Sequence, residues 1–337
     1  MPQQLVRQFE VLIRRDPARR GLIGTEAEHG ELCPGHLLAA AEHLAEHAVS
    51  VAIVTGFFVP HGAPPSAETD GPPGAVLLAA AFSAVGIETV VLTDEHCQGA
   101  VQAAASATGL PDESVLIAPS GSADWVRWFF VNGPGRRLTH LIAIERAGPS
   151  HTPESFRAQH RDRPPPTETF ESHSPAETHN RCHNMRGRII DDHTADLHRL
   201  FEMLGTHRPD AVTIGIGDGA NEIGMGAIPW EELHRRLNGG RAGRIPCRIA
   251  TDWNIVAGTS NWGGYALAAA TVLLRDRIDV MRPWGDERQQ QVLEQMVRNG
   301  PAVDGITARQ EPTVDGLPFL TYIQPCTAIR RLLGWED

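Results

Sequence analysis

Short runs of β-branched and aliphatic residues alternate along this chain with longer runs rich in alanine and leucine. The short runs have the length of buried strands, and the longer ones suit helices packed on a sheet. We predict strands at 51–56, 89–93, 114–118, 140–144, 211–215 and 247–251. We predict helices at 37–47, 75–85, 97–108, 123–131, 192–204, 230–237, 264–276 and 287–298.

This alternation is typical of an α/β fold with a mainly parallel sheet flanked by helices, in a Rossmann-like layered architecture. No repeat of fixed period is visible, so we expect a single α/β domain over residues 1–337. The first residues form an amphipathic helix without an apolar signal core. Near the other end, the sequence VDGLP at 314–318 predicts a hairpin turn.

The segment 149–184 differs from the rest because it is rich in Pro, His, Thr and Glu and has few apolar residues. Such a composition buries little apolar surface on folding. We therefore predict a mobile loop or lid here, and a tolerated insertion is an equally good interpretation.

The composition narrows the classes of partner. Lys and Arg number 30 against 41 Asp and Glu, which gives a formal net charge of −11. An acidic chain without a basic run is a poor nucleic-acid binder, and its apolar stretches are too short to span a membrane. The five scattered cysteines lack a CxxC pair and indicate a reducing compartment, so we expect a cytoplasmic location.

The strongest chemical signal is the sequence GIGDGANEIGMG at 215–226, which follows a predicted strand. Glycines at the carboxyl end of a strand let a ligand approach the backbone, and this is the edge where α/β sheets bind ligands. Asp218, Asn221 and Glu222 would project there and suit cation binding, amine binding or proton transfer. The loop lacks the GxGxxG and GxxxxGK[ST] patterns, so no nucleotide is favoured. A structural turn with solvated acids is the competing interpretation.

Further polar groups follow predicted strands or precede predicted helices. Glu68, Thr69 and Asp70 lie before the helix at 75–85, where Asp70 also suits a capping role. Glu145 and Arg146 follow a predicted strand, where they would form either a buried ion pair or a clamp for an anion. Asp252 is expected to end a strand. Ser260 and Asn261 precede an alanine-rich helix, where they would bind a carboxylate or cap the helix.

Together these blocks resemble the D-glutamate cyclase family. The matching stretches are TGF at 55–57, ETDGPPGA at 68–75, HLIAIERAG at 140–148, GIGDGANEIGMG at 215–226, DWNIVAGTSNWGGYALA at 252–268 and VDGLPF at 314–319. They span nearly the whole chain in the family's order. The resemblance implies a lyase that interconverts D-glutamate and 5-oxo-D-proline with loss of water. It also implies a fold related to the cyclase domain of larger mitochondrial proteins.

The hypothesis that follows gives these residues roles towards a small acidic amino acid. The expected catalytic residues are Asp218, Glu222 and Asn221. The expected substrate-binding residues are Thr69, Arg146, Gly217, Gly219, Ser260 and Asn261. A divalent cation, Mg²⁺ or Mn²⁺, would be held by Glu68, Asp70 and Asp218. The alternatives are a non-catalytic binding domain for an acidic amino acid or nucleotide, and a nicotinamide-dependent oxidoreductase. A homo-oligomer is left open.

Overall fold

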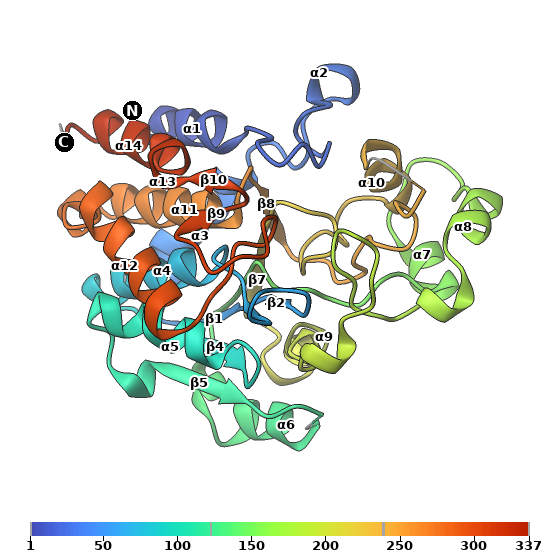
Figure 1. The fold of residues 1–337 in the computed structure, drawn as a ribbon, viewed down its shortest axis with the longest axis horizontal. Coiled ribbons are helices and arrows are strands. Elements are labelled where there is room, and N and C mark those ends of the chain that lie inside the picture. The colour runs from blue at the N-terminus through green and yellow to red at the C-terminus, as the bar shows by residue number, and fades with distance from the viewer. Residues whose placement is uncertain (1, 122, 238–239, 336–337) are drawn as a thin grey trace.

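A six-stranded parallel sheet forms the centre of the computed structural model, which describes residues 2–121, 123–237 and 240–335 (Figure 1). Its strands are β1 (Ser50–Thr55), β4 (Glu88–Asp94), β5 (Val115–Ala118), β6 (His140–Ile144), β7 (Val212–Gly217) and β8 (Trp253–Val256). They lie in the order β5-β4-β1-β6-β7-β8, and every neighbouring pair is parallel. The α/β class predicted from the sequence is confirmed.

The strand order reverses direction between β1 and β6. From β1 the chain adds β4 and β5 on one side, and it then returns to add β6, β7 and β8 on the other. The connections after β1 and after β6 therefore diverge and leave space at the carboxyl edge of the sheet. This switch point is where open α/β sheets bind ligands.

The prediction for the sixth strand was wrong. Residues 247–251 make only isolated bridges, and the strand is β8, which begins at Trp253. Asp252 immediately precedes β8 instead of ending a strand. Its Oδ2 accepts hydrogen bonds from the backbone N and the Oγ1 of Thr213 near the start of β7, each at 2.7 Å. Asp252 therefore lies at the amino edge of the sheet, away from the other acids that the sequence singled out.

Alternate residues along each strand face opposite sides, and helices cover both. Val51 and Ile53 point into a core with one set of helices, whereas Ala52 and Val54 face the other set. The first set is α1 (Pro2–Ile13), α3 (His36–His47), α4 (Pro72–Ala84), α5 (Gln98–Thr108), α11 (Ser260–Leu274), α12 (Asp286–Asn299) and α14 (Gln324–Leu332). The second is α6 (Ala123–Val131), α9 (His198–His207) and α10 (Trp230–Arg236). No helix in the described ranges has the length and apolar character to cross a membrane.

Short elements complete the chain. They are α2 (Glu26–His29), β2 (Phe58–Val59), β3 (Ser66–Ala67), α7 (Pro153–Ala158), α8 (Thr167–His173), β9 (Thr313–Val314), β10 (Leu317–Pro318), α13 (Phe319–Tyr322) and 3₁₀ turns at Asp112–Ser114, Pro134–Arg137, Ala176–Thr178, Asp191–His193 and Ile278–Met281. The predicted hairpin is confirmed, because β9 and β10 pair antiparallel around Asp315 and Gly316, whose φ angles are 52° and 73°. Two successive residues with positive φ are typical of a tight hairpin turn.

The segment 149–184 contains two helices, α7 and α8, which lie beside α10 at the edge of the molecule (Figure 1). Phe156 and Phe170 stack with ring centroids 4.3 Å apart, and both rings meet Trp230 edge-on. These three buried side chains form a small core of their own. The burial of these aromatic side chains therefore orders a segment whose composition suggested little buried surface. That the segment moves as a lid stays a prediction.

Candidate active site

The N-termini of α4 and α11 meet at the carboxyl edge of the sheet and cap each other. Asp70, just before α4, accepts hydrogen bonds from the backbone N of Ser260 (2.7 Å) and of Asn261 (2.9 Å) in α11. In return, Asn261 Oδ1 accepts from the backbone N of Gly71 (3.0 Å) and of Gly74 (2.8 Å) in α4. The two residues between these glycines are prolines without N–H groups, so this exchange satisfies the donors of that turn. It also directs the positive ends of two helix dipoles towards one place.

Glu145 is held at this place by an unusual backbone conformation. It follows β6 with a φ of 46°, which non-glycine residues seldom adopt. Its Oε2 accepts a 2.5 Å hydrogen bond from Ser260 Oγ, so its side chain lies against the start of α11. Such conformations concentrate at functional sites, where the surrounding structure enforces them.

Asp218 at the end of β7 is bound by an arginine from the first loop of the chain. Arg20 Nη1 lies 2.5 Å from Asp218 Oδ2, and Arg20 Nη2 lies 2.7 Å from Asp315 Oδ1 in the β9–β10 hairpin. Asp16 fixes the loop, because its two carboxylate oxygens accept from the backbone N of Arg20 and of Gly21, each at 2.9 Å. Segments from both ends of the chain thus close over the sheet edge.

The glycine-rich loop uses its glycines for close packing. Glu222 Oε1 accepts a 3.0 Å hydrogen bond from the backbone N of Gly219, so this amide is already bound. A Cβ at Gly219 would lie 2.6 Å from that same oxygen, and a Cβ at Gly217 would lie 2.8 Å from Met225 Cε. Asn221 Nδ2 donates to the carbonyl of His183 at 2.9 Å. The predicted substrate contacts of Gly217 and Gly219 stay predictions.

Six carboxyl groups gather around this loop, and most are shifted towards the protonated form. The group comprises Glu68, Asp70, Glu145, Asp218, Glu222 and Asp315, all buried. Burial raises the pKa of Asp70 to about 7 and that of Glu222 to about 7, and it raises the pKa values of Glu68, Glu145 and Asp218 well above their usual range. Neighbouring carboxylates add to the shifts, and Arg20 opposes them for Asp70, Glu145, Asp218 and Glu222.

Several oxygens of this cluster have no hydrogen-bond partner among the described residues. They are Glu68 Oε1, Asp218 Oδ1, Asn221 Oδ1 and Glu222 Oε2. Buried acceptors without donors are rare in native proteins and indicate a missing proton, ligand or ion. The predicted metal set is brought together in part: oxygens of Asp70, Glu145 and Asp218 lie within 4.8 Å of one another.

A cavity of about 270 Å³ opens onto the cluster. Its wall contains the acids Glu68 and Glu145, the amides of Asn184 and Asn221, and the basic side chains of Arg20, His61 and Arg186. Phe57, Phe58, Val59, Met185 and Ile306 supply apolar surface, and Ala18 and Gly305 complete the lining. Its size and its mixture of apolar walls and a few polar groups suit a small polar ligand.

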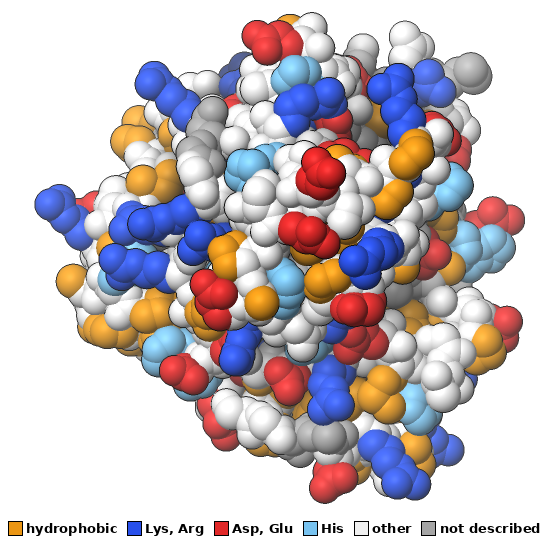
Figure 2. All heavy atoms as spheres, turned by 90° about the vertical axis from the view of Figure 1, so that its right-hand side faces the viewer, with side chains coloured by type: hydrophobic (Ala, Val, Ile, Leu, Met, Phe, Trp, Pro, Cys, Tyr) orange, Lys and Arg blue, Asp and Glu red, His pale blue; other side chains and the backbone are white. Residues whose placement is uncertain are grey.

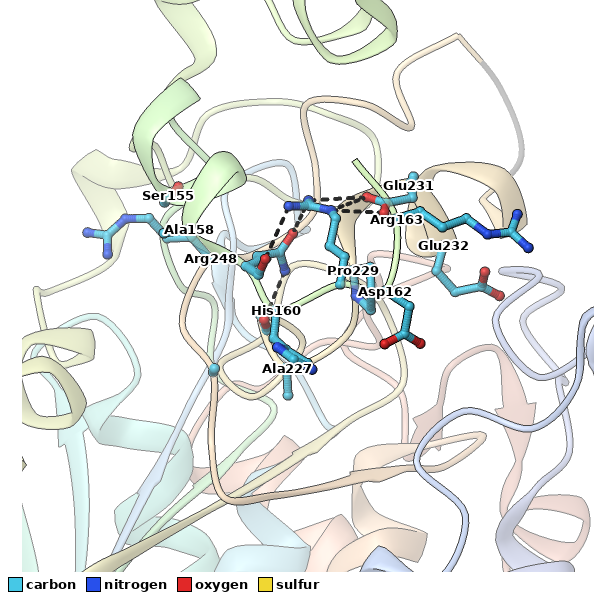
Figure 3. A pocket seen from close by; sticks show the side chains of 14 residues that line it. Ser155, Ala158, His160, Asp162, Arg163, Ala227, Pro229, Glu231, Glu232 and Arg248 are labelled. Atoms are coloured by element: carbon cyan, nitrogen blue, oxygen red, sulfur yellow. Dashed lines mark hydrogen bonds and ion pairs between the residues drawn. The ribbon is translucent and has the colours of Figure 1, made fainter. Parts of the chain in front are cut away.

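A second hollow, of about 850 Å³, lies under the 149–184 segment (Figure 3). None of the predicted site residues lines it. Two of its polar side chains already have partners: Arg161 pairs with Glu231 at 2.9 Å, and Gln159 Nε2 donates to the carbonyls of Gly226 and Ile228. The outer face over α7, α8 and α10 carries acidic and basic side chains side by side (Figure 2). We therefore take the smaller cavity as the candidate active site.

Several predicted substrate-binding residues have internal partners. Arg146 forms a 2.6 Å ion pair with the buried Asp94 and donates to the carbonyls of Gly56 and Ala195. Thr69 Oγ1 donates to the carbonyl of Thr313 at 2.6 Å. These contacts, like those of Ser260 and Asn261, position the loops around the cavity, and direct contact of these residues with a substrate stays a prediction.

The sequence reasoning missed two residues of the cluster, Arg20 and Asp315, and undervalued Glu145. Asp315 lies within VDGLPF, which predicted a turn and matched the family but gave this acid no role. Arg20 stands in an arginine-rich N-terminal stretch with no motif around it. The useful signal was the excess of acids at strand ends, because buried carboxyl groups need either a proton or a cation as a partner.

The amino-acid sequence of the chain is similar to that of a known protein family. The family model described as "D-glutamate cyclase-like, C-terminal" matches residues 9–164 and 169–329. The human protein named "D-glutamate cyclase, mitochondrial" is 30% identical over 347 residues, which cover 94% of this chain and 50% of that protein. The chain thus spans half the length of this relative.

Proposed function

The chain belongs to the D-glutamate cyclase-like family, and from this premise we propose that it interconverts D-glutamate and 5-oxo-D-proline with loss of water. The observation that carries the proposal is the cavity at the switch point, whose buried carboxyl groups and unpartnered oxygens face a space of about 270 Å³. The preference for the D-isomer comes from the family alone. We keep the cytoplasmic location as a prediction.

The reaction requires proton transfer within a folded substrate. The nitrogen attacks the γ-carboxyl carbon, the new N–C bond closes the ring, and a C–O bond breaks to release water. Overall, two protons pass from the ammonium group to the departing oxygen. A protonated carboxyl group that donates a proton to the departing oxygen and then recovers one from the ammonium group performs this transfer.

Glu68 is the acid best placed for this role. It lines the cavity, its Oε1 has no partner among the described residues, and burial keeps its pKa well above the usual range. Asn221 Oδ1, also unpartnered, would accept an N–H of the substrate amine and orient it. Asp218 and Glu222 belong to the cluster behind this wall, where their charges would set the protonation of Glu68, so ring closure would depend on both.

The donor set also fits a hard divalent cation. Asp70, Glu145 and Asp218 would hold Mg²⁺ or Mn²⁺ through carboxylate oxygens, the ligands such ions prefer. A bound cation would polarise the γ-carboxylate and stabilise the developing oxyanion. The chain lacks the GxGxxG and GxxxxGK[ST] patterns, so we do not propose a nicotinamide-dependent reaction.

The direct test is turnover followed by NMR. Purified protein is incubated with D-glutamate or L-glutamate, with and without a chelator, and the 5-oxoproline signals are recorded. Glu68→Gln should reduce the rate by about 10²–10⁴-fold, as expected for loss of general acid–base catalysis. Glu113→Gln, at an exposed position, is the matched control. Binding of D-glutamate without turnover in any condition would indicate a non-catalytic binding domain instead.

A further inference from the structure

The charged side chains of the cavity differ between its floor and its rim. Glu68 and Glu145 are buried at its floor, whereas Arg186 is exposed at its rim. His61 stands near both Arg186 and Arg188, since burial lowers the pKa of His61 and the charges of these two guanidinium groups lower it further. A zwitterion with a carboxylate at the rim and its amine towards the floor matches this distribution of charge.

Arg186 has no anionic partner in the part of the chain that the structure describes. Its guanidinium makes no ion pair within 4.0 Å, and its Nη2 donates only a 3.2 Å hydrogen bond to the carbonyl of Ile306. Arg20, the other guanidinium of the cavity wall, is already bound by Asp218 and Asp315. Arg186 is therefore the cation that retains donors for a ligand.

The loop around Arg186 is built to hold it in place. Asn184 Oδ1 accepts hydrogen bonds from the backbone N of Arg186 and of Arg188, both at 3.0 Å, and Gly187 closes the turn with a φ of 70°. Nε2 of His61 is buried and has no hydrogen-bond partner among the described residues. The remaining N–H groups of Arg186 and the ring nitrogen Nε2 of His61 thus lie in the wall of one cavity without a partner among the described residues.

We propose that Arg186, with His61 beside it, binds the α-carboxylate of the substrate and so makes this carboxylate a requirement for tight binding. The inference rests on the proposed function. Ring closure joins the amine to the γ-carboxyl group, so these two groups must fold together over the acids at the floor. The α-carboxylate does not react, and it extends to the rim.

This assignment has a kinetic consequence. D-glutamate and 5-oxo-D-proline share the α-carboxylate, so Arg186 contributes equally to the binding of both and of the transition state between them. Loss of such uniform binding raises KM and leaves kcat unchanged. An arginine that bound the γ-carboxylate would instead affect D-glutamate and spare 5-oxo-D-proline.

The test compares 5-oxo-D-proline with 5-oxo-D-prolinamide, whose carboxylate is replaced by a neutral amide. Dissociation constants are measured by NMR titration for the unaltered protein, for Arg186→Gln and for Arg188→Gln. Arg188 is exposed in the same loop and is absent from the cavity lining, so it is the matched control. Arg186→Gln should bind the acid about tenfold more weakly, the value of one charge-assisted contact, and bind the amide unchanged. Arg188→Gln should match the unaltered protein.

The outcomes separate the two proposals. If the unaltered protein binds 5-oxo-D-proline and Arg186→Gln keeps the full preference for acid over amide, this inference is overturned while the proposed function stands. If the unaltered protein binds neither 5-oxo-D-proline nor D-glutamate, both are overturned. Because Arg186 is exposed, its replacement should leave the fold intact, which circular dichroism checks.

Discussion

The reciprocal capping of α4 and α11 makes Asn261 a sensitive position. Replacing it with alanine removes an acceptor shared by the backbone N–H groups of Gly71 and Gly74, and a donor that lies 3.2 Å from the carbonyl oxygen of Thr69. All these groups are buried, so water does not readily replace the lost partners. The substitution therefore leaves three backbone polar groups unsatisfied.

The magnitude follows from that count. Each buried polar group left without a partner costs about 1–3 kcal/mol, and loss of a helix cap costs about 1 kcal/mol. Local relaxation recovers part of this, so we expect Asn261→Ala to lower the free energy of unfolding by about 3–5 kcal/mol. That is a large share of the roughly 5–15 kcal/mol that stabilises a typical domain.

Urea unfolding monitored by tryptophan fluorescence measures this loss. Asn299→Ala is the matched control, because Asn299 is exposed at the end of α12 and its side chain donates to Gln295 in the same helix. The control should change the unfolding free energy by less than about 0.5 kcal/mol. A loss below about 1 kcal/mol for Asn261→Ala would refute the cross-capping argument.

Three other predictions concern catalysis, pH and the first loop. Asp218→Asn and Glu222→Gln should each abolish most turnover with the fold retained, and full NMR-detected activity in both would rule out a role for these acids. Burial lowers the pKa of His140 from 6.5 to about 3, so below pH 6.5 this histidine stays neutral in the folded state while it is protonated in the unfolded chain. The free energy of unfolding should therefore fall by about 1.4 kcal/mol for each pH unit below 6.5. His140→Phe should flatten the drop in urea midpoint between pH 7 and 5, and an equal drop in both proteins would contradict this. A Cβ at Gly258 would overlap the carbonyl oxygen of Arg15, so Gly258→Ala should lower the melting temperature by several degrees.

The sequence predicted most of the sheet because buried parallel strands carry a local signal. Five of the six strands lie where β-branched runs predicted them. The sixth was displaced because Cys247 and Ile249 are buried like strand residues, yet they pack against the glycine-rich loop. Only tertiary pairing distinguishes such a segment from β8.

The helix caps show a different limit. The sequence correctly predicted that Asp70 and Asn261 stand at helix starts, where each suits a cap. It assigned each residue to its own helix, whereas in the structure each caps the other's helix. Capping propensity depends on residue type, but the choice of partner depends on how two distant helices pack. The same reason hid the contact between Arg20 and Asp315, which are 295 positions apart.

The charge of the cluster leads to a last prediction, in which stability and activity change in opposite directions. Burial raises the pKa of Glu222 from 4.5 to about 7. The folded state therefore holds a proton that the unfolded chain has lost, and the stability this gives is present below pH 4.5 and lost as the pH rises through 7. At pH 8 the buried carboxylate is ionised beside other acids, and Glu222→Gln removes this penalty. We expect the variant to be about 1–3 kcal/mol more stable than the unaltered protein at pH 8 in urea unfolding, and no more stable at pH 5. A variant that is less stable than the unaltered protein at pH 8 would mean that a favourable partner holds the Glu222 carboxylate. The cluster would then not hold the extra protons that ring closure would use.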